Sequence, residues 1–590
     1  MGEVETSQES PSEEQREGNT VLPLEMLEKI FWLLPARDLK TVVLVCKRWK
    51  EAADNPKLWT YSVKFTYDLD RCMLADGEAP RDSDKDVNFM QEASKVRRFE
   101  TVRKIKFYLC PANVFKPVIE GALQHAGLRE LHLEQGDVSA IDPDTLSQFL
   151  TRMEEVKITM VEMTLEQTTS FLRALHNTHQ IKTLLWDHPN SFRQIDDVNE
   201  LDPTLLANAV KNVERLELRP ELTREQARSL FQVLQEDGSS VKWLSLEAIG
   251  NNPRNYVNGE NTGPFADPES MGRAIVKLEV ADFRASSLTE RENNLRTDQI
   301  TAMLTAIAAG KSTLQKLILR GNCLNQVDPQ VLAGMVRELD ELNLQNTLLT
   351  TEQMDQMFET IGTLGPGKLR QLILAGNDLS DVNHNGLALM VTDLVALDLS
   401  ETKLCKEQVD AIFSKLAESP GKLKKLVLEG IDLREVEAEL IAGMVTQVKW
   451  LNIKGTRLTT IQLDQIFETL AEGPGNLRNL KIDYNDLRGV DPDVMANAVN
   501  SLDSVSMSDM PFLTRYQMKT ILTQALEEGS YLKYLDIGYP YSSNCRNKVW
   551  KRGEVSVFDD KFGNQNQNLR DELFGQIATY CYHYDKWHNR

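Results

Sequence analysis

Two stretches of the sequence contain residue types that could hold a small ligand, and the first resembles a phosphate-binding loop. Residues 310–313 read GKST, which is how such a loop ends, with backbone amides and a lysine around the phosphate. The loop also needs an earlier glycine, but position 305 is threonine, and the stretch follows an expected helix instead of a strand. We therefore expect no nucleotide site here.

The second stretch, near the C-terminus, contains metal-ligating side chains. They are Cys581, His583, Asp585 and His588. Their spacing matches no common zinc pattern, so we expect a surface helix without a metal. The motifs G-x-S-x-G and H-E-x-x-H and the Gly-rich dinucleotide loop do not occur either. We predict no catalytic residue and no cofactor, and therefore a protein that acts by binding.

Three aromatic residues are the candidates for such binding. Trp243, Trp450 and Tyr534 each occupy a position that is polar in most similar segments of the chain. Aromatic anchors of this kind can each contribute about 2 kcal/mol or more to a protein interface. Trp243 is the foremost of the three because it also precedes a group of insertions.

A repeating pattern supplies the elements that position these aromatics. Residues 314–324 read LQKLILRGNCL, in which Leu317 and Leu319 alternate as in a strand and Asn322 can hydrogen-bond the turn that follows. The pattern returns at residues 369–379 and 477–487. Alignment of the first core position gives 16 candidate units, at Val102, Leu128, Met153, Ile181, Val213, Val241, Ile275, Leu314, Leu339, Leu369, Leu394, Leu423, Val448, Leu477, Leu502 and Leu532.

The units come in two kinds with different helix starts. From Leu314 onward a short unit of 25 residues alternates with a long one of 29 or 30, so the true repeat is a pair. Several short units have Asp-Pro, an N-cap followed by the first helical residue, at Asp142, Asp202, Asp267, Asp328 and Asp491. Many long units have the capping-box pattern Thr-x-x-Gln, at Thr164/Gln167, Thr223/Gln226, Thr350/Gln353, Thr459/Gln462 and Thr514/Gln517.

The spacing L-x-x-L-x-L-x-x-N-x-L resembles the leucine-rich-repeat family. Units of this length with a helix opposite each strand indicate an α/β horseshoe, a solenoid with its strands on the concave side. The paired period resembles the ribonuclease-inhibitor type of horseshoe, although the regular cysteines of that type are absent.

The strand positions between the leucines should face the concave side, and many of them are charged. Basic residues are frequent in short units: Arg129, Lys182, Lys242, Lys316, Arg370, Lys424, Lys425, Arg478, Lys481 and Lys533. Acids are frequent in long units: Glu154, Glu155, Glu214, Asp340, Glu341, Asp398 and Asp503. Opposite charges on neighbouring strands can pair, so we expect ion pairs across the sheet.

Three insertions interrupt the period, at residues 187–201, 247–266 and 281–296. Each follows a predicted strand, so we expect all three on one rim of the horseshoe, either as binding loops or as neutral surface insertions.

Residues 21–59 differ in character from the repeats. They contain the order L-P-x-E-x-L-x-x-I-F-x-x-L, D-L, V-C-x-x-W and P-x-L-W, at Leu22, Pro23, Glu25, Leu27, Ile30, Phe31, Leu34, Asp38, Leu39, Val45, Cys46, Trp49, Pro56, Leu58 and Trp59. This order resembles an F-box. The resemblance implies a small all-α domain that docks on the Skp-type adaptor of a cullin ubiquitin ligase. It places adaptor contacts on Leu22, Pro23, Leu27, Ile30, Phe31, Leu39, Val42 and Trp49, some of which must instead hold the domain together.

Composition and charge bound the remaining possibilities. A net charge of −21 disfavours nucleic acid and anionic membranes as partners. Seven scattered cysteines, an N-terminus without an apolar core and no apolar run of spanning length indicate a cytoplasmic or nuclear protein. The expected organisation is a disordered acidic tail (1–18), the F-box (19–60), a linker (61–101), the leucine-rich-repeat solenoid (102–538) and a C-terminal cap (539–590).

The leading hypothesis is a non-catalytic substrate receptor of an SCF-type ubiquitin ligase. The F-box would recruit the adaptor, and through it the cullin, while the repeats hold a protein substrate. The alternative is a repeat scaffold or inhibitor that binds proteins without ubiquitination. A third possibility is an array that senses a small molecule through the insertions.

Overall fold

The chain divides into two compact repeat units in the computed structural model, an N-terminal unit of residues 1–222 and 237–241 and a C-terminal unit of residues 223–236 and 242–590. The structure describes residues 26–27, 31, 45, 49, 52, 63–66, 103–108, 115–116, 119–120, 123, 127–187, 200–219, 222–246, 256–257, 260–261, 267–285, 295–418, 422–508, 514–525, 530–536 and 549–551.

Parallel strands and helices alternate in the N-terminal unit. Each strand pairs in register with the next one along the chain, from β1 to β6. The strands are β1 (Val63–Thr66), β2 (Lys104–Tyr108), β3 (Glu130–Asp137), β4 (Glu155–Glu162), β5 (Thr183–Asp187) and β6 (Arg215–Leu218). The helices are α7 (Pro143–Thr151), α8 (Leu165–His176) and α10 (Pro203–Val210).

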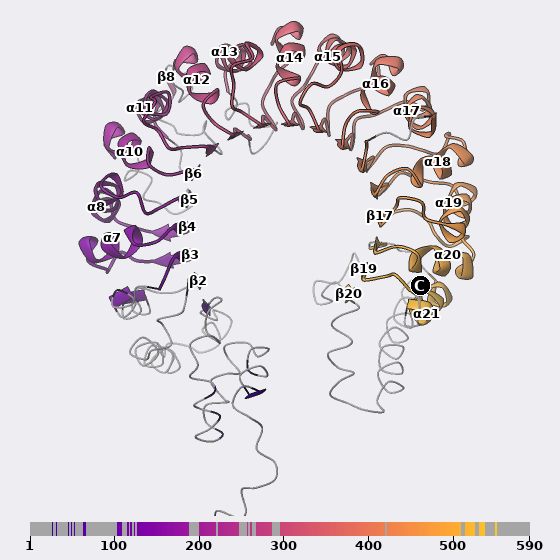
Figure 1. Ribbon diagram of the computed structural model, residues 1–590, viewed down its shortest axis with the longest axis horizontal. Coiled ribbons are helices and arrows are strands. Elements are labelled where there is room, and N and C mark those ends of the chain that lie inside the picture. The colour runs from indigo at the N-terminus through magenta and orange to yellow at the C-terminus, as the bar shows by residue number, and fades with distance from the viewer. Residues whose placement is uncertain are drawn as a thin grey trace, which may run out of the picture. The chain divides into compact units, whose positions relative to one another are not determined.

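The C-terminal unit repeats the same arrangement over a longer stretch. Its parallel strands are β7 (Trp243–Leu246), β10 (Val280–Asp282), β11 (Lys316–Ile318), β12 (Glu341–Asn343), β13 (Gln371–Ile373), β14 (Ala396–Asp398), β15 (Lys425–Val427), β16 (Trp450–Asn452), β17 (Asn479–Lys481), β18 (Ser504–Ser506) and β19 (Tyr534–Asp536). Its helices are α11 (Arg224–Leu234), α12 (Pro268–Ile275), α13 (Thr297–Ala308), α14 (Pro329–Val336), α15 (Thr351–Leu364), α16 (His384–Met390), α17 (Lys406–Glu418), α18 (Ala438–Val445), α19 (Thr460–Glu472), α20 (Pro492–Asn500) and α21 (Arg515–Ala525). Within this unit the strands lie along the inner side of a curve and the helices along its outer side (Figure 1).

The strand positions confirm the predicted leucine-rich-repeat solenoid. Fifteen of the sixteen repeat strands begin two residues after the predicted first core position. The exception is the seventh unit, where Ile275 was the wrong choice because it ends α12, and the core position before β10 is the buried Leu278. Each repeat strand buries its second residue, and the helices of long units add buried phenylalanines such as Phe358, Phe413 and Phe467.

Both predicted kinds of helix start are confirmed. The Asp-Pro N-caps accept backbone hydrogen bonds at Asp142, Asp202, Asp267, Asp328 and Asp491. The capping-box hydrogen bonds between Thr and Gln are present in the five predicted long units. In one short unit without Asp-Pro, Asn383 takes the N-cap position of α16 and accepts from Asn385 N at 2.9 Å.

An Asp491→Ala substitution tests the N-cap assignment. The Asp491 carboxylate accepts from the backbone amides of Asp493 and Val494 at 2.9 and 3.0 Å. Loss of such a cap costs about 1 kcal/mol, so urea unfolding of the full chain should show a loss of this size. Asp493→Ala, in the same first turn but without a capping role, is the control and should cost less than about 0.5 kcal/mol. Equal losses in the two variants would contradict the assignment.

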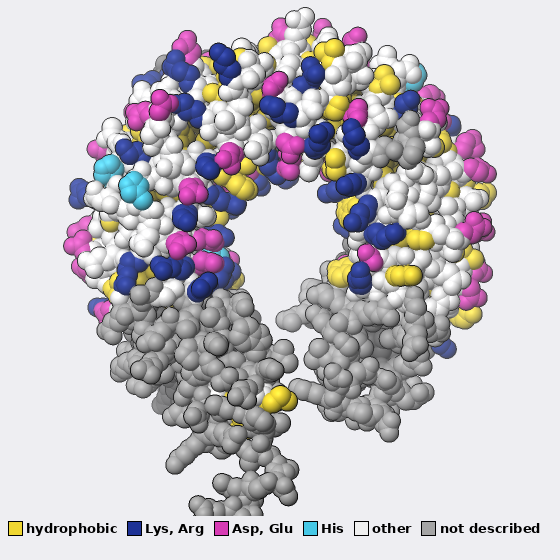
Figure 2. All heavy atoms as spheres, in the orientation of Figure 1, with side chains coloured by type: hydrophobic (Ala, Val, Ile, Leu, Met, Phe, Trp, Pro, Cys, Tyr) yellow, Lys and Arg dark blue, Asp and Glu magenta, His cyan; other side chains and the backbone are white. Residues whose placement is uncertain are grey.

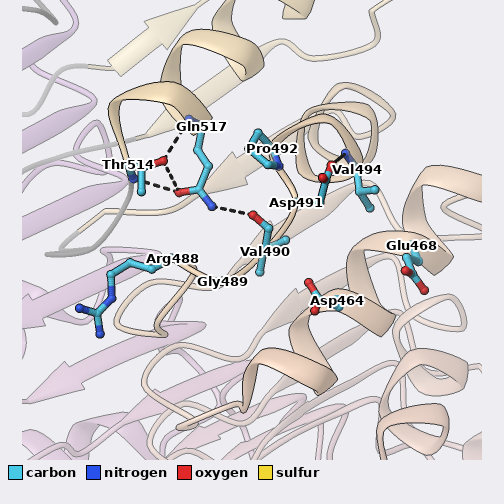
Figure 3. A pocket seen from close by; sticks show the side chains of 10 residues that line it. All are labelled: Asp464, Glu468, Arg488, Gly489, Val490, Asp491, Pro492, Val494, Thr514 and Gln517. Atoms are coloured by element: carbon cyan, nitrogen blue, oxygen red, sulfur yellow. Dashed lines mark hydrogen bonds between the residues drawn. The ribbon is translucent and has the colours of Figure 1, made fainter.

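The capping-box glutamines also join neighbouring repeats, which the sequence motif does not reveal. The Gln462 side chain donates from Nε2 to the carbonyls of Leu433 and Val436 in the preceding unit, at 2.8 and 2.6 Å. Gln353 and Gln408 make the same two kinds of bond. Figure 3 shows the Gln517 side chain bonded to Thr514 and to the Val490 carbonyl. In these units one buried amide therefore satisfies a helix start and two carbonyls of the previous repeat.

The asparagines of the repeat pattern play a similar role at the ends of the strands. Asn377 Nδ2 donates to the carbonyls of Leu374 and Leu344 at 2.8 and 2.7 Å, and its Oδ1 accepts from the Thr347 amide at 3.1 Å. Asn485 repeats the pattern toward Ile482 and Ile453. The predicted turn-bonding role of the asparagine is confirmed, and the bond to the neighbouring repeat extends it.

The flanking segments are described only in part. Strand β1 lies in the segment predicted as a linker, and it pairs with β2. At the other end, β20 (Val549–Lys551) pairs antiparallel with β19 and so covers the edge of that strand.

The acidic tail, the rest of residues 539–590 and most of the three insertions lie outside the described residues. Within the second insertion, β8 (Tyr256–Val257) pairs with β9 (Glu260–Asn261). The capping role and the shared rim stay predictions. In the described parts of the chain, no helix is long and apolar enough to span a membrane.

Candidate functional site

The candidate site is the face of the strands that the helices leave uncovered, which we call the strand face. In most strands the central residue is buried and its two neighbours are partly exposed, as in Lys316–Ile318 and Asn479–Lys481. Because the strands pair in register, equivalent residues form continuous rows across each unit. Binding residues on this face are therefore ordered by repeat number.

The three predicted aromatic anchors lie on the strand face of the C-terminal unit but do not form one site. Each is the first residue of its strand and is partly exposed, so they share one row. Seven strand spacings separate Trp243 from Trp450 and three separate Trp450 from Tyr534. At about 4.8 Å per strand these separations are about 34 and 14 Å. At Trp450 the ammonium group of Lys425 lies over the ring, 4.8 Å from its centroid.

Cross-strand ion pairs confirm part of the predicted charge pattern. Opposite charges meet at Arg129 and Glu154 (3.3 Å), Lys242 and Glu279 (3.3 Å), Lys316 and Glu341 (2.5 Å), and Lys533 and Asp503 (3.1 Å). The prediction fails for Lys182, Arg370, Lys424, Lys425, Arg478 and Lys481, which have no carboxylate within 4.0 Å in the described part of the chain. Positive charge on β15–β17 is therefore not fully neutralised.

Sequence reasoning missed Lys454 and Tyr484, which the structure places beside Trp450. Lys454 follows β16 and pairs with Glu429 at 2.8 Å, while its ammonium group lies 5.3 Å from the centroid of the Tyr484 ring. The hydrogen bond with Glu429 raises the pKa of Lys454. Burial favours a higher pKa for Glu429, but hydrogen bonds from Lys454 and Asn452 outweigh it and hold the pKa low. Both groups are therefore charged at neutral pH. Lys454 and Tyr484 each follow the end of a strand. A search limited to the alternating inward and outward residues within strands therefore does not find them.

The F-box-like residues that the structure describes separate into buried and exposed ones. Leu27 and Phe31 are 2% and 1% exposed, and the Phe31 ring contacts Trp49 edge-on with centroids 5.4 Å apart. Leu27 and Phe31 therefore pack inside the described part of this segment, and their adaptor contacts stay predictions. Met26 and Val45 are 46% and 57% exposed and are apolar residues that the docking set omitted.

Of the other predicted docking residues, the structure describes Trp49 alone. Trp49 is partly exposed. Leu22, Pro23, Ile30, Leu39 and Val42 lie outside the described residues, so their adaptor contacts stay predictions.

A cluster in the N-terminal unit brings together three side chains of metal-ligating type. Ligand atoms of Glu130, His132 and Glu155 lie within 4.8 Å of one another. Both carboxylates already form ion pairs, Glu130 with Lys104 at 2.9 Å and Glu155 with Lys157 at 2.8 Å. The charges are therefore balanced within the sheet, and we assign the cluster to cross-strand pairing rather than to a metal.

This cluster gives a prediction for the pH dependence of stability. Burial lowers the pKa of His132 below 6.5, although its hydrogen bond with Glu155, at 3.0 Å, opposes the shift. Because the folded pKa lies below the unfolded one, the contribution to stability is complete above about pH 6.5 and is lost as the pH falls. Thermal unfolding of the full chain from pH 8 to pH 5 should therefore show a smaller loss in His132→Gln than in the wild type. The exposed His179→Gln control should follow the wild type, and parallel curves for all three would contradict the assignment.

We also considered as a binding site a hollow beside the helices, which is lined by acidic residues. Asp464 and Glu468 of α19 and the N-cap Asp491 line it (Figure 3). Burial, together with the charges of Glu468 and Asp491, raises the pKa of Asp464. Asp491 already accepts two amides of its own helix. We assign this hollow to the packing of neighbouring helices.

Comparisons with known proteins give a family-model match and similarities to solved structures. A family model described as F-box-like matches residues 20–63. No curated protein matches the chain. Among solved structures, an internalin from Listeria monocytogenes is 14% identical and has a TM-score of 0.32, with 80% of this chain and 100% of that chain covered. The leucine-rich-repeat protein LegL7 from Legionella pneumophila is 15% identical with a TM-score of 0.35, over 51% of this chain and 96% of that one. At these scores the two structures carry no argument about function. The chain thus joins an F-box-like domain to leucine-rich repeats, an architecture for protein interaction.

Proposed function

We propose that this protein is the substrate-recognition subunit of an SCF-type ubiquitin ligase. The F-box-like domain docks on a Skp-type adaptor and, through it, on a cullin. The strand face of the repeats holds a protein substrate for ubiquitin transfer. The chain itself does no chemistry in this proposal, since the other subunits of the ligase supply the transfer step.

The observation that carries the proposal is the F-box-like match at residues 20–63, on the N-terminal side of the repeats. Exposed apolar side chains in this segment support it, because Met26 and Val45 lie open beside the buried Leu27 and Phe31. Exposed apolar groups of this kind are typical of interfaces. A scaffold that acts only through its repeats has no need of them.

The proposal places the protein in the cytoplasm or the nucleus, with neither nucleic acid nor a membrane as partner. Cys323 and Cys405 are both free thiols, as a reducing compartment requires. The net charge of −21 repels polyanions and anionic lipid surfaces.

Adaptor-dependent capture of the cullin tests the proposal. The full chain is immobilised and offered purified cullin–RING complex with and without the Skp-type adaptor. We expect cullin on the chain only when the adaptor is present. No cullin under either condition would contradict the proposal and favour a scaffold or inhibitor that binds proteins without ubiquitination.

A further inference from the structure

Five residues on β15–β17 and the turns that follow form what we call the basic-aromatic patch: Lys425, Trp450, Lys454, Lys481 and Tyr484. They come from three consecutive repeats, because Lys425 is the register partner of Trp450 and Asn452 is that of Lys481. Figure 2 shows Lys and Arg side chains alternating with apolar ones along the inner edge of the C-terminal unit in this region. The patch is thus a continuous part of the strand face.

The two aromatic rings of the patch are positioned by lysines and by the backbone. The Lys425 ammonium group lies 4.8 Å from the centroid of Trp450, and that of Lys454 lies 5.3 Å from the centroid of Tyr484. Tyr484 is 51% exposed and has a φ of 56°, an uncommon backbone conformation for a residue with a side chain. Gly455 occupies the same place in the preceding repeat, and a Cβ there would make only an ordinary contact, 3.9 Å from that of Tyr484. The turn after β17 therefore presents an exposed ring beside Lys454.

The carboxylates inside the patch are already engaged. Glu429 accepts from Lys454 at 2.8 Å and from Asn452 at 3.1 Å. The buried Asp483 accepts from the hydroxyls of Ser506 and Ser508, both at 2.7 Å. Neither is bound to Lys425 or Lys481, which have no carboxylate within 4.0 Å among the residues described. The patch therefore keeps positive charge in a protein whose net charge is −21.

Two more lysines extend this positive charge along the starts of the strands. Lys424 and Lys449 are exposed and lie on adjacent repeats, because the Lys449 amide donates to the Lys424 carbonyl at 2.8 Å. They form no ion pair with a described residue. Acidic residues bound the region on both sides, with Asp398 on β14 bonded to Ser400 and Asp503 before β18 paired with Lys533. The positive region is therefore three repeats wide.

We propose that the basic-aromatic patch binds an acidic, extended segment of the substrate protein. Its Asp and Glu carboxylates meet Lys425 and Lys481, and an apolar or aromatic side chain between them packs on Trp450. Three strands about 4.8 Å apart and a rise of about 3.4 Å per residue mean that about three or four residues cross the patch. The inference rests on the proposed function only in taking the bound protein to be the substrate.

A protein segment fits this patch better than a nucleic acid does. Nonspecific nucleic-acid binding relies on a long positive groove that follows the phosphate backbone, together with stacked aromatics. Here Asp398 and Asp503 end the positive region after three repeats, and the rest of the chain carries a large negative charge. A short acidic peptide meets the lysines without extending along these flanks.

Fluorescence anisotropy with the full chain tests the proposal. The probe is a labelled peptide of about eight residues, rich in Asp and Glu around one Phe, and its control has Lys in place of the acids. We expect binding of the acidic peptide alone, weakened by added salt. Lys425→Glu/Lys481→Glu should weaken it by about tenfold or more, whereas Lys311→Glu/Lys415→Glu, the same charge change outside the patch, should alter it by less than about twofold. Trp450→Ala should also weaken it, and Trp450→Phe should restore most of the affinity.

Several outcomes would overturn the inference. Equal binding of both peptides, or equal loss in the patch and control variants, would show that the patch does not select acidic segments. A single-stranded oligonucleotide that displaced the peptide at lower concentration would assign the patch to nucleic acid instead.

Adaptor capture by the Lys425→Glu/Lys481→Glu variant separates this inference from the proposed function. Retained capture without acidic-peptide binding by the wild type would overturn the inference alone. Peptide binding that fails in the patch variant, in a protein that captures no adaptor, would support the inference and reject the ligase assignment.

Discussion

A Leu22→Ala/Pro23→Ala double variant should weaken the capture of a purified Skp-type adaptor by about 700-fold. The F-box resemblance places these two residues in the docking surface, and interface hot spots cost about 2 kcal/mol each when truncated, so the pair should cost about 4 kcal/mol. Surface plasmon resonance with immobilised full-length chain measures the loss. Val45→Asp, which puts a charge on an exposed apolar side chain of the same domain, should weaken capture as well.

Two further variants serve as controls for this prediction. Leu364→Ala truncates a leucine that is also exposed, but on α15 of the repeats, and should leave capture unchanged. Phe31→Ala removes a buried ring and should act through folding, with a loss of about 3–5 kcal/mol in the stability of the F-box-like domain. Undiminished capture by the double variant would remove the ligase assignment.

The second large effect is expected at a single buried amide. Gln462→Met keeps the size of the side chain but leaves the carbonyls of Leu433 and Val436 and the amide of Thr459 without their partner. Each buried group left unsatisfied costs about 1–3 kcal/mol, so the C-terminal unit should lose about 3 kcal/mol or more in free energy of unfolding. Urea unfolding of the full chain followed by circular dichroism measures it.

The matched control is Gln330→Met, the same chemical change at an exposed position of α14. It should change the free energy of unfolding by less than about 0.5 kcal/mol. A loss below about 1 kcal/mol in Gln462→Met would show that the amide caps its own helix without joining the repeats.

Most of the fold follows from the sequence because the repeat fixes both spacing and burial. Leu317 and its equivalents in other units each predicted a strand within a residue or two, and the Asp-Pro and Thr-x-x-Gln signals placed the helix starts. The one error, Ile275, has a physical cause. Ile275 and Leu278 are both buried aliphatic residues three positions apart, and an insertion before this unit removes the period that would choose between them.

The candidate site was less predictable, because exposure and partners depend on neighbouring repeats. Trp450 stands out in its own unit, but its pairing with Lys425 arises only when the two strands lie in register. Tyr484 follows the end of β17 in a left-handed backbone conformation, where the alternation of inward and outward residues no longer holds. Helical spacing placed Phe31 on the apolar face of a predicted helix. It does not show which residues of that face are buried within the chain itself.

The roles of the buried glutamines were hidden for a related reason. A capping box is a local motif, and Gln462 satisfies it within its own helix. Its second function depends on two carbonyls 26 and 29 residues earlier, which come into reach only after the repeats stack. Local signals therefore predicted the elements, while the contacts between repeats required the structure.

Capture of purified Skp-type adaptor by the full-length chain, beside a chain of residues 61–590, tests the central claim most directly. Circular dichroism of both chains establishes that the repeats are folded in each. The account predicts a stoichiometric complex with the full-length chain and none with residues 61–590. No complex with either chain, or equal complexes with both, would contradict the assignment of residues 20–63 as the part that joins this protein to a ubiquitin ligase.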